Sequence, residues 1–113
     1  MTTRTRLCIV GPMTGLPEYN YPAFHAAASR LRVAGYSVTN PADNRLPEGA
    51  KWVEYMDRAI PQIFEAEGLA LLPGYRSSNG ARIEVAIARH RGIPIRTVDR
   101  WVADAELYAV RQG

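Results

Sequence analysis

The residues best suited to chemistry lie in the segment PGYRSSNGARIE, which follows a short apolar run. Residues 77–80 are small or polar and supply backbone amides at the expected start of a helix, which favours anion binding. Glu84 follows among apolar side chains, so its carboxylate should be partly desolvated, yet the positive end of the helix should keep it ionised. Glu84 is therefore a candidate catalytic residue; the alternative is a glutamate that caps the helix.

A second loop, GPMTGLPEYNYP, also leads from an apolar run directly into an expected helix. Its glycines allow a ligand to approach the backbone closely, and the start of the helix presents free N–H groups. A rigid strand-to-helix turn would explain the same residues. Tyr19 and Asn20 could contact a base or simply pack the loop. The two loops give these candidate substrate-binding residues: Gly11, Pro12, Met13, Thr14, Gly15, Tyr19, Asn20, Ser78, Asn79 and Gly80.

Short apolar runs alternate with longer amphipathic segments along the whole chain. This pattern predicts strands at residues 5–10, 36–39, 69–72 and 94–98, and helices at 22–34, 52–66, 80–90 and 102–110. Pro61 should kink the second helix or make it restart. The helical spacing places the following residues of the third helix on one face: Ile83, Ala86, Ile87 and His90.

The order of these elements predicts one α/β domain over residues 1–113. Strands that alternate with helices favour a Rossmann-like or flavodoxin-like three-layer sandwich, with a small parallel sheet of four to five strands and helices on both faces. In such sheets ligands bind beyond the carboxyl ends of the strands, near the point where the strand order reverses. We therefore expect the ligand near the loops at residues 11–21 and 73–79.

Composition narrows the class of protein further. The 113 residues are 47% hydrophobic and 22% charged, which is typical of a globular domain, and the net charge of +3 suits a small anionic ligand. The basic residues are scattered, so nucleic acid is not an expected partner. The single Cys8 allows neither an internal disulfide nor a cysteine metal cluster, and belongs in the core. Without an apolar segment long enough for a signal peptide or membrane span, we expect a cytoplasmic protein.

Three segments carry a resemblance to a known family: GPMTG, PAFHAAASRLRVAGYSVTNPAD and LALLPGYRSSNGARIEVAIARHRGIPI. Over residues 7–98 the chain resembles an uncharacterised, phage-associated branch of the nucleoside 2-deoxyribosyltransferase-like superfamily (DUF4406-like). In related transferases and nucleotide N-glycosidases, a glycine stands four residues before a glutamate that attacks the anomeric carbon of the sugar. Gly80 and Glu84 have this spacing, so the resemblance implies that Glu84 is the nucleophile.

The resemblance also implies a ligand and an assembly. Transferases of this type tend to have an aspartate six residues before the glutamate, whereas hydrolases of nucleoside monophosphates tend to have a serine there. Ser78 therefore favours a 5′-monophosphate. Arg76 and Arg82 are candidate partners of that phosphate, and the alternative for each is a solvated surface charge. No cofactor or metal is implied. Relatives often form sites across subunits, so we expect a homodimer or larger homo-oligomer, with apolar contacts from Trp52, Trp101 and Tyr108.

The chain departs from the pattern of that superfamily on the second helix. The usual acid/base aspartate aligns with Ala59, and Asp57 could replace it only if the helix changed phase locally, because residues two apart face different sides. The leading hypothesis is cleavage or transfer of an N-glycosidic bond, with Glu84 and Asp57 as catalytic residues. One alternative is a nucleotide-binding or sensor protein without catalysis. Another is an assembly protein that uses the fold as a scaffold.

Overall fold

The sheet is parallel throughout, as the sequence predicts. The computed structural model describes residues 4–44, 46–47 and 49–112. Its strands lie in the order β2-β1-β3-β4, with these bounds: β1 (Arg6–Val10), β2 (Ser37–Thr39), β3 (Gly68–Leu71) and β4 (Ile95–Thr97). Leu7 of β1 pairs with Val38 on one side and with Gly68 on the other. The prediction of a flavodoxin-like or Rossmann-like α/β fold is confirmed.

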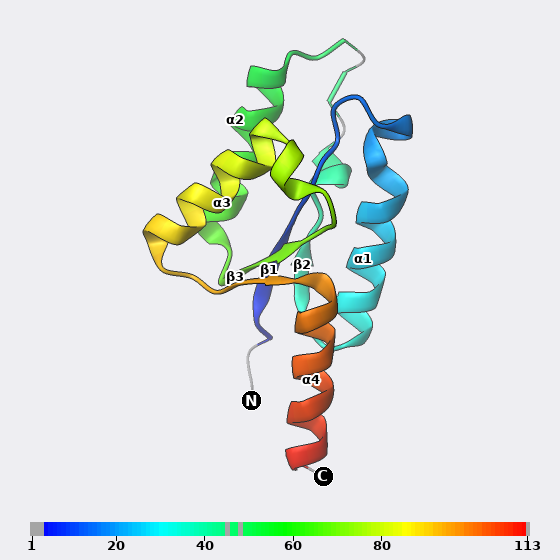
Figure 1. Cartoon of the computed structure of the whole chain (residues 1–113), viewed down its shortest axis with the longest axis vertical. Helices are drawn as coiled ribbons and strands as arrows, with labels where there is room; N and C mark the ends of the chain where they lie inside the picture. The colour runs from blue at the N-terminus through cyan, green and yellow to red at the C-terminus, as the bar shows by residue number, and fades with distance from the viewer. Residues whose placement is uncertain (1–3, 45, 48, 113) are drawn as a thin grey trace.

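Helices cover both faces of this sheet (Figure 1). The four helices are α1 (Tyr21–Val33), α2 (Trp52–Glu65), α3 (Asn79–Arg91) and α4 (Val98–Gln112), and short 3-10 helices lie at η1 (Pro17–Asn20), η2 (Pro41–Asn44) and η3 (Tyr75–Ser77). Leu7 and Ile9 pack into the core on the side of α1 and α4, whereas Cys8 and Val10 pack toward α2 and α3. In the part of the chain that the structure describes, no helix has the length and apolar character needed to cross a membrane.

Two helices differ in detail from the prediction. The second helix runs through Pro61 without a restart, so of the two alternatives for this position the restart is wrong. Pro61 has no amide N–H to donate to the carbonyl of residue 57, and both residues lie on the exposed side of the helix. The last helix begins at Val98, before the predicted start at residue 102, because the Thr97 hydroxyl accepts a hydrogen bond from the Arg100 N–H at 3.1 Å and caps the first turn.

Trp101 is a core residue, so its expected role in a subunit contact is wrong. Only 5% of the residue is exposed, and its Nε1 donates a 2.7 Å hydrogen bond to the Leu69 carbonyl. The indole packs edge-on against Tyr36, and its face carries the Arg96 guanidinium at 4.6 Å. Gly68 makes room for it, because a Cβ there would lie 2.8 Å from Trp101 Cζ2.

The contact between Gly68 and Trp101 predicts a stability effect. Gly68→Ala should lower the free energy of unfolding by about 1–3 kcal/mol, the usual penalty for overpacking a core. Trp101→Phe removes the outer ring that the new methyl would strike, so Gly68→Ala should cost less in the Trp101→Phe background. Urea unfolding of wild type, the two single variants and the double variant measures the coupling. Equal penalties in both backgrounds would show that the indole is not the source of the effect.

Candidate functional site

The loops that follow β1 and β3 meet at the carboxyl edge of the sheet. The Asn20 Nδ2 donates a 3.0 Å hydrogen bond to the Pro12 carbonyl, and a Cβ at Gly74 would lie 3.4 Å from Pro12 Cγ. Between these loops and the start of α2 lies a cleft of about 810 Å³, a size typical of small-molecule sites. The residues that line it are Pro12, Thr14, Leu16, Asn20, Trp52, Pro73, Gly74, Ser77, Ser78, Asn79 and Gly80.

The cleft brings together six of the ten candidate substrate-binding residues. These six are Pro12, Thr14, Asn20, Ser78, Asn79 and Gly80. Gly11 and Met13 are buried instead, and Gly11 is needed for packing because a Cβ there would lie 2.7 Å from Leu72 Cβ. Gly15 and Tyr19 are exposed outside the lining. The two loops thus form one site, with part of the first loop serving to support it.

The first loop reaches the cleft through strained backbone. Glu18, Tyr19 and Asn20 have φ angles of 53°, 52° and 61°, in the left-handed region that non-glycine residues rarely adopt. Asn20 tolerates this conformation better than most residues, and its side chain is fixed by Pro12. Three such residues in succession are costly and typical of segments whose shape is set by function.

The start of α3 presents donors to the cleft. The Ser78 Oγ accepts a 3.2 Å hydrogen bond from the Ala81 N–H and so caps the helix, and its own proton stays free for a ligand. Asn79 and Gly80 are the first helical residues, whose amides have no partner within the helix. None of the lining side chains carries a formal charge. The positive end of α3 therefore sets the local field, and it favours an anion.

Glu84 lies on the buried face of α3. The buried residues of this helix are Gly80, Ala81, Glu84, Val85 and Ala88, whereas Ile83, Ala86 and His90 are exposed, so the predicted apolar face is wrong. Glu84 is only 3% exposed, and its Oε2 is buried without a hydrogen-bond partner. The carboxyl lies one turn beyond Gly80 and does not itself line the cleft. It caps no helix end, which excludes the structural role considered from the sequence.

The expectation that Glu84 stays ionised is contradicted. Burial raises the pKa of its carboxyl to about 8. Glu84 lies in the second turn of α3, and the effect of a helix end falls off within the first turn, so desolvation dominates. The group is close enough to affect two neighbours: burial first, and then the Glu84 charge, raise the pKa of the Cys8 thiol and of the Tyr55 hydroxyl.

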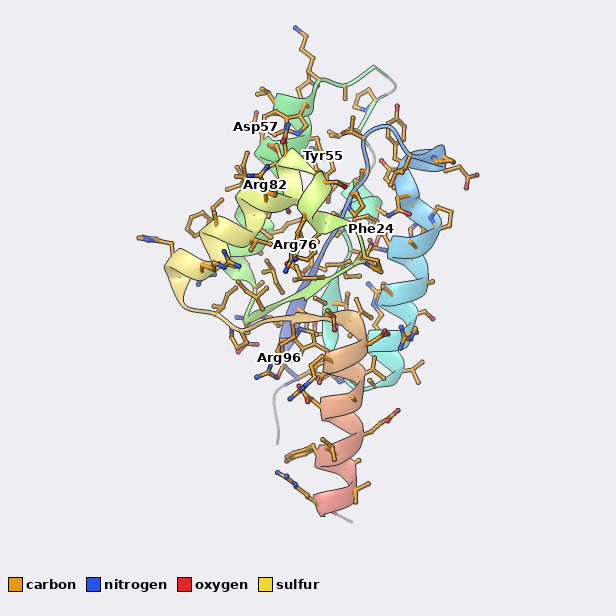
Figure 2. The ribbon with its side chains drawn as sticks, in the orientation of Figure 1. Phe24, Tyr55, Asp57, Arg76, Arg82 and Arg96 are labelled. Atoms are coloured by element: carbon orange, nitrogen blue, oxygen red, sulfur yellow. The ribbon has the colours of Figure 1, made fainter. Side chains whose placement is uncertain are left out.

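No acidic residue of α2 faces Glu84. Asp57 is exposed on the outer side of the helix, and Ala59 is completely buried. Figure 2 shows Asp57 and Tyr55 on different sides of α2. The change of helical phase that would bring Asp57 into the site is absent. Tyr55, one turn before Ala59, is instead the polar residue of α2 that Glu84 affects, and its raised pKa keeps the hydroxyl protonated.

Trp52, for which the sequence indicates only a candidate subunit contact, is an aromatic residue of the cleft. Trp52 lines the cleft and is 46% exposed; a Cβ at Gly80 would lie 3.4 Å from its Nε1 and 3.2 Å from Met56 Sδ. Gly80 thus allows α2 and α3 to meet closely beneath the cleft. The sequence did contain a signal for Trp52, because it is the first residue of a helix entered from the carboxyl edge of the sheet.

The remaining candidates lie outside the cleft. Arg76 and Arg82 line neighbouring hollows, and Arg76 is held by Tyr75, whose hydroxyl accepts a 3.2 Å hydrogen bond from its Nε. Among the described residues, His, Cys, Asp and Glu side chains form no group of three or more that could hold a metal ion.

The family of the chain follows from its sequence. A family model described as a domain of unknown function, DUF4406, matches residues 5–97. The chain belongs to the DUF4406 family. A comparison with curated proteins found no match. The match of this DUF4406 domain extends from β1 to β4 and therefore includes both loops of the cleft and Glu84.

The buried carboxyl of the DUF4406 domain should make its stability depend on pH. The folded pKa of about 8 lies above the ordinary value of 4.5, so between these values the folded chain holds a proton that the unfolded chain has lost. The contribution of Glu84 to the free energy of unfolding is therefore present in full below pH 4.5. It falls as the pH rises to 8, by at most about 1.4 kcal/mol per pH unit. Glu84→Gln should remove this slope and be more stable than wild type at pH 8.

Thermal or urea unfolding between pH 5 and 8 measures this effect. Glu106→Gln, at an exposed position of α4, removes the same charge and should keep the wild-type slope. A Glu84→Gln variant with the wild-type slope would mean that Glu84 does not titrate in the folded chain.

Proposed function

We propose that this DUF4406 domain binds a nucleoside 5′-monophosphate, or a nucleoside, and cleaves or transfers its N-glycosidic bond with Glu84 as the nucleophile. The observation that carries the proposal is the buried carboxyl of Glu84, whose Oε2 has no hydrogen-bond partner and which lies one turn of α3 beyond Gly80 of the cleft. A polar group buried without a hydrogen bond costs stability, and an apolar residue would pack there more favourably. Such perturbed groups beside a cavity are typical of functional sites.

The cleft supports this class of ligand. Its volume of about 810 Å³ is sufficient for a nucleotide, and the half-exposed indole of Trp52 offers a flat surface to a base. The start of α3, with the Ser78 hydroxyl and the amides of Asn79 and Gly80, suits a phosphate. Because no carboxylate lines the cleft, no lining side chain repels that phosphate.

The chemistry requires the ionised form of Glu84. A carboxylate can trap the oxocarbenium-like sugar as a covalent intermediate, and water or a second base then releases it. The departing base needs a proton, and the protonated hydroxyl of Tyr55, the residue of α2 that the Glu84 charge affects, is the candidate donor. Its raised pKa makes it a weak acid, so we expect slow turnover.

A second candidate function is nucleotide binding without catalysis. It is favoured by the exposure of Asp57, the burial of Ala59, and the separation of Glu84 from the cleft lining.

Homo-oligomerisation is part of both proposals. For this, α4 offers exposed apolar side chains at Leu107, Tyr108 and Val110, and Figure 1 shows that this end of α4 extends beyond the sheet.

Incubation with deoxynucleosides and their 5′-monophosphates tests the catalytic proposal. We expect wild type to release free base from at least one of them, and Glu84→Gln and Glu84→Ala to abolish the release, while Glu106→Gln retains it. Chromatography of the products with and without an added acceptor base separates transfer from hydrolysis. Release of base by both Glu84 variants at the wild-type rate would contradict the proposed mechanism. Calorimetric binding without any release would favour the second candidate.

The pH profile of turnover should report the same carboxyl. Below a pKa of about 8 the ionised fraction of Glu84 in the free protein rises about tenfold per pH unit, so kcat/KM should rise with that slope and level off above pH 8. Stopped assays with a deoxynucleoside well below its KM, from pH 5.5 to 9, measure it. A kcat/KM that falls as the pH rises toward 8 would assign the nucleophile to another group.

A further inference from the structure

A second hollow adjoins the cleft on the outer side of α3. We call it the arginine groove; it has a volume of about 910 Å³ and is lined in part by Trp52, Arg76, Asn79, Arg82, Ile83 and Arg89. No acidic residue lines it. Arg76 comes from η3 and Arg82 from α3, and both line this hollow (Figure 2). The groove therefore combines three positive charges with an apolar floor.

These three arginines are unpaired in the part of the chain that the structure describes. Arg6, Arg30, Arg96 and Arg100 each form an ion pair with a carboxylate, but Arg76, Arg82 and Arg89 form none. The guanidinium of Arg76 lies 5.6 Å from the centre of the Tyr75 ring. Like charges gathered without a counter-ion repel one another, so binding of an anionic ligand in the groove would relieve this repulsion.

The arginine groove continues from the cleft. Trp52 and Asn79 line both hollows. Asn79 is the first residue of α3, where the proposed function places the 5′-phosphate. A second phosphate joined to the first would therefore leave the uncharged cleft at Asn79 and enter the groove, where guanidinium groups can bind it bidentately.

We propose that the ligand of this domain is a nucleoside 5′-diphosphate ester, with its base and first phosphate in the cleft and its second phosphate and attached unit in the arginine groove. This inference rests on the proposed position of the first phosphate. The groove is larger than one phosphate requires, and the side chain of Ile83, 39% exposed, provides apolar surface for the attached sugar or nucleoside. A free diphosphate would leave that surface uncovered.

Calorimetry with three ligands on one base tests the proposal. The three ligands are a nucleoside 5′-monophosphate, the corresponding 5′-diphosphate and the corresponding diphosphate-glucose. They share the base whose 5′-monophosphate binds wild type most tightly. We expect the diphosphate to bind about tenfold more tightly than the monophosphate, the effect of one charge-assisted hydrogen bond, and the diphosphate-glucose at least as tightly as the diphosphate. Quenching of Trp52 fluorescence, with the buried Trp101 as an internal reference, follows the same titrations.

Variants of the groove separate its contribution from that of the cleft. Because Arg82 and Arg89 line the groove and not the cleft, Arg82→Gln/Arg89→Gln should remove the tenfold gain and leave monophosphate binding unchanged. Arg58→Gln, at an exposed position of α2 outside both hollows, should keep the gain. Three outcomes would overturn this inference but leave the proposed function standing. They are a diphosphate that binds no better than the monophosphate, a gain that survives the double variant, and a diphosphate-glucose that binds more weakly than the diphosphate. Failure of wild type to bind any monophosphate would instead remove the proposed function.

Discussion

The parallel pairing of β1 with β3 is the constraint on which the site depends. The last residues of the two strands, Val10 and Leu71, are partners, and the Leu72 N–H extends the pairing with a 2.8 Å hydrogen bond to the Val10 carbonyl. The loops that leave these strands must therefore begin side by side. One leads into α1 on one face of the sheet and the other into α3 on the opposite face, so a cleft opens between them. Gly11 permits this close approach beside Leu72.

The placement of Glu84 follows from how α3 packs on the sheet. The helix lies with its small residues, Gly80, Ala81 and Ala88, toward α2 and the strands. That orientation turns Glu84 inward as well, toward Cys8. The protein thus holds a carboxyl in an environment that favours its neutral form. The same burial that destabilises the ionised group at high pH would strengthen its interaction with a developing positive charge in the ligand.

Much of this arrangement is encoded in local patterns. Alternating apolar runs and amphipathic segments predicted the four strands, the four helices and the parallel sheet, and loop positions predicted where the cleft lies. Hydrophobic periodicity failed on α3, because it assigns Ile83 and Ala86 to the apolar face, whereas close packing of the small residues turns Ala81 and Ala88 inward instead. Trp101 was misjudged for a related reason: the cavity that it fills exists because Gly68, far away in sequence, has no side chain. Contacts of this kind between distant segments leave no local signature.

The buried carboxyl also bears on the evolutionary history of the family. Packing alone determines Gly11 and Gly68, so any chain that keeps the fold has reason to keep them. Position 84 is different, because stability favours an uncharged residue there, whereas the proposed function requires glutamate. Under that proposal, a lineage that no longer meets the ligand would drift toward glutamine, leucine or methionine at this position while its fold persisted. The residue at position 84 would then separate descendants that keep the proposed activity from those that have inherited only its scaffold.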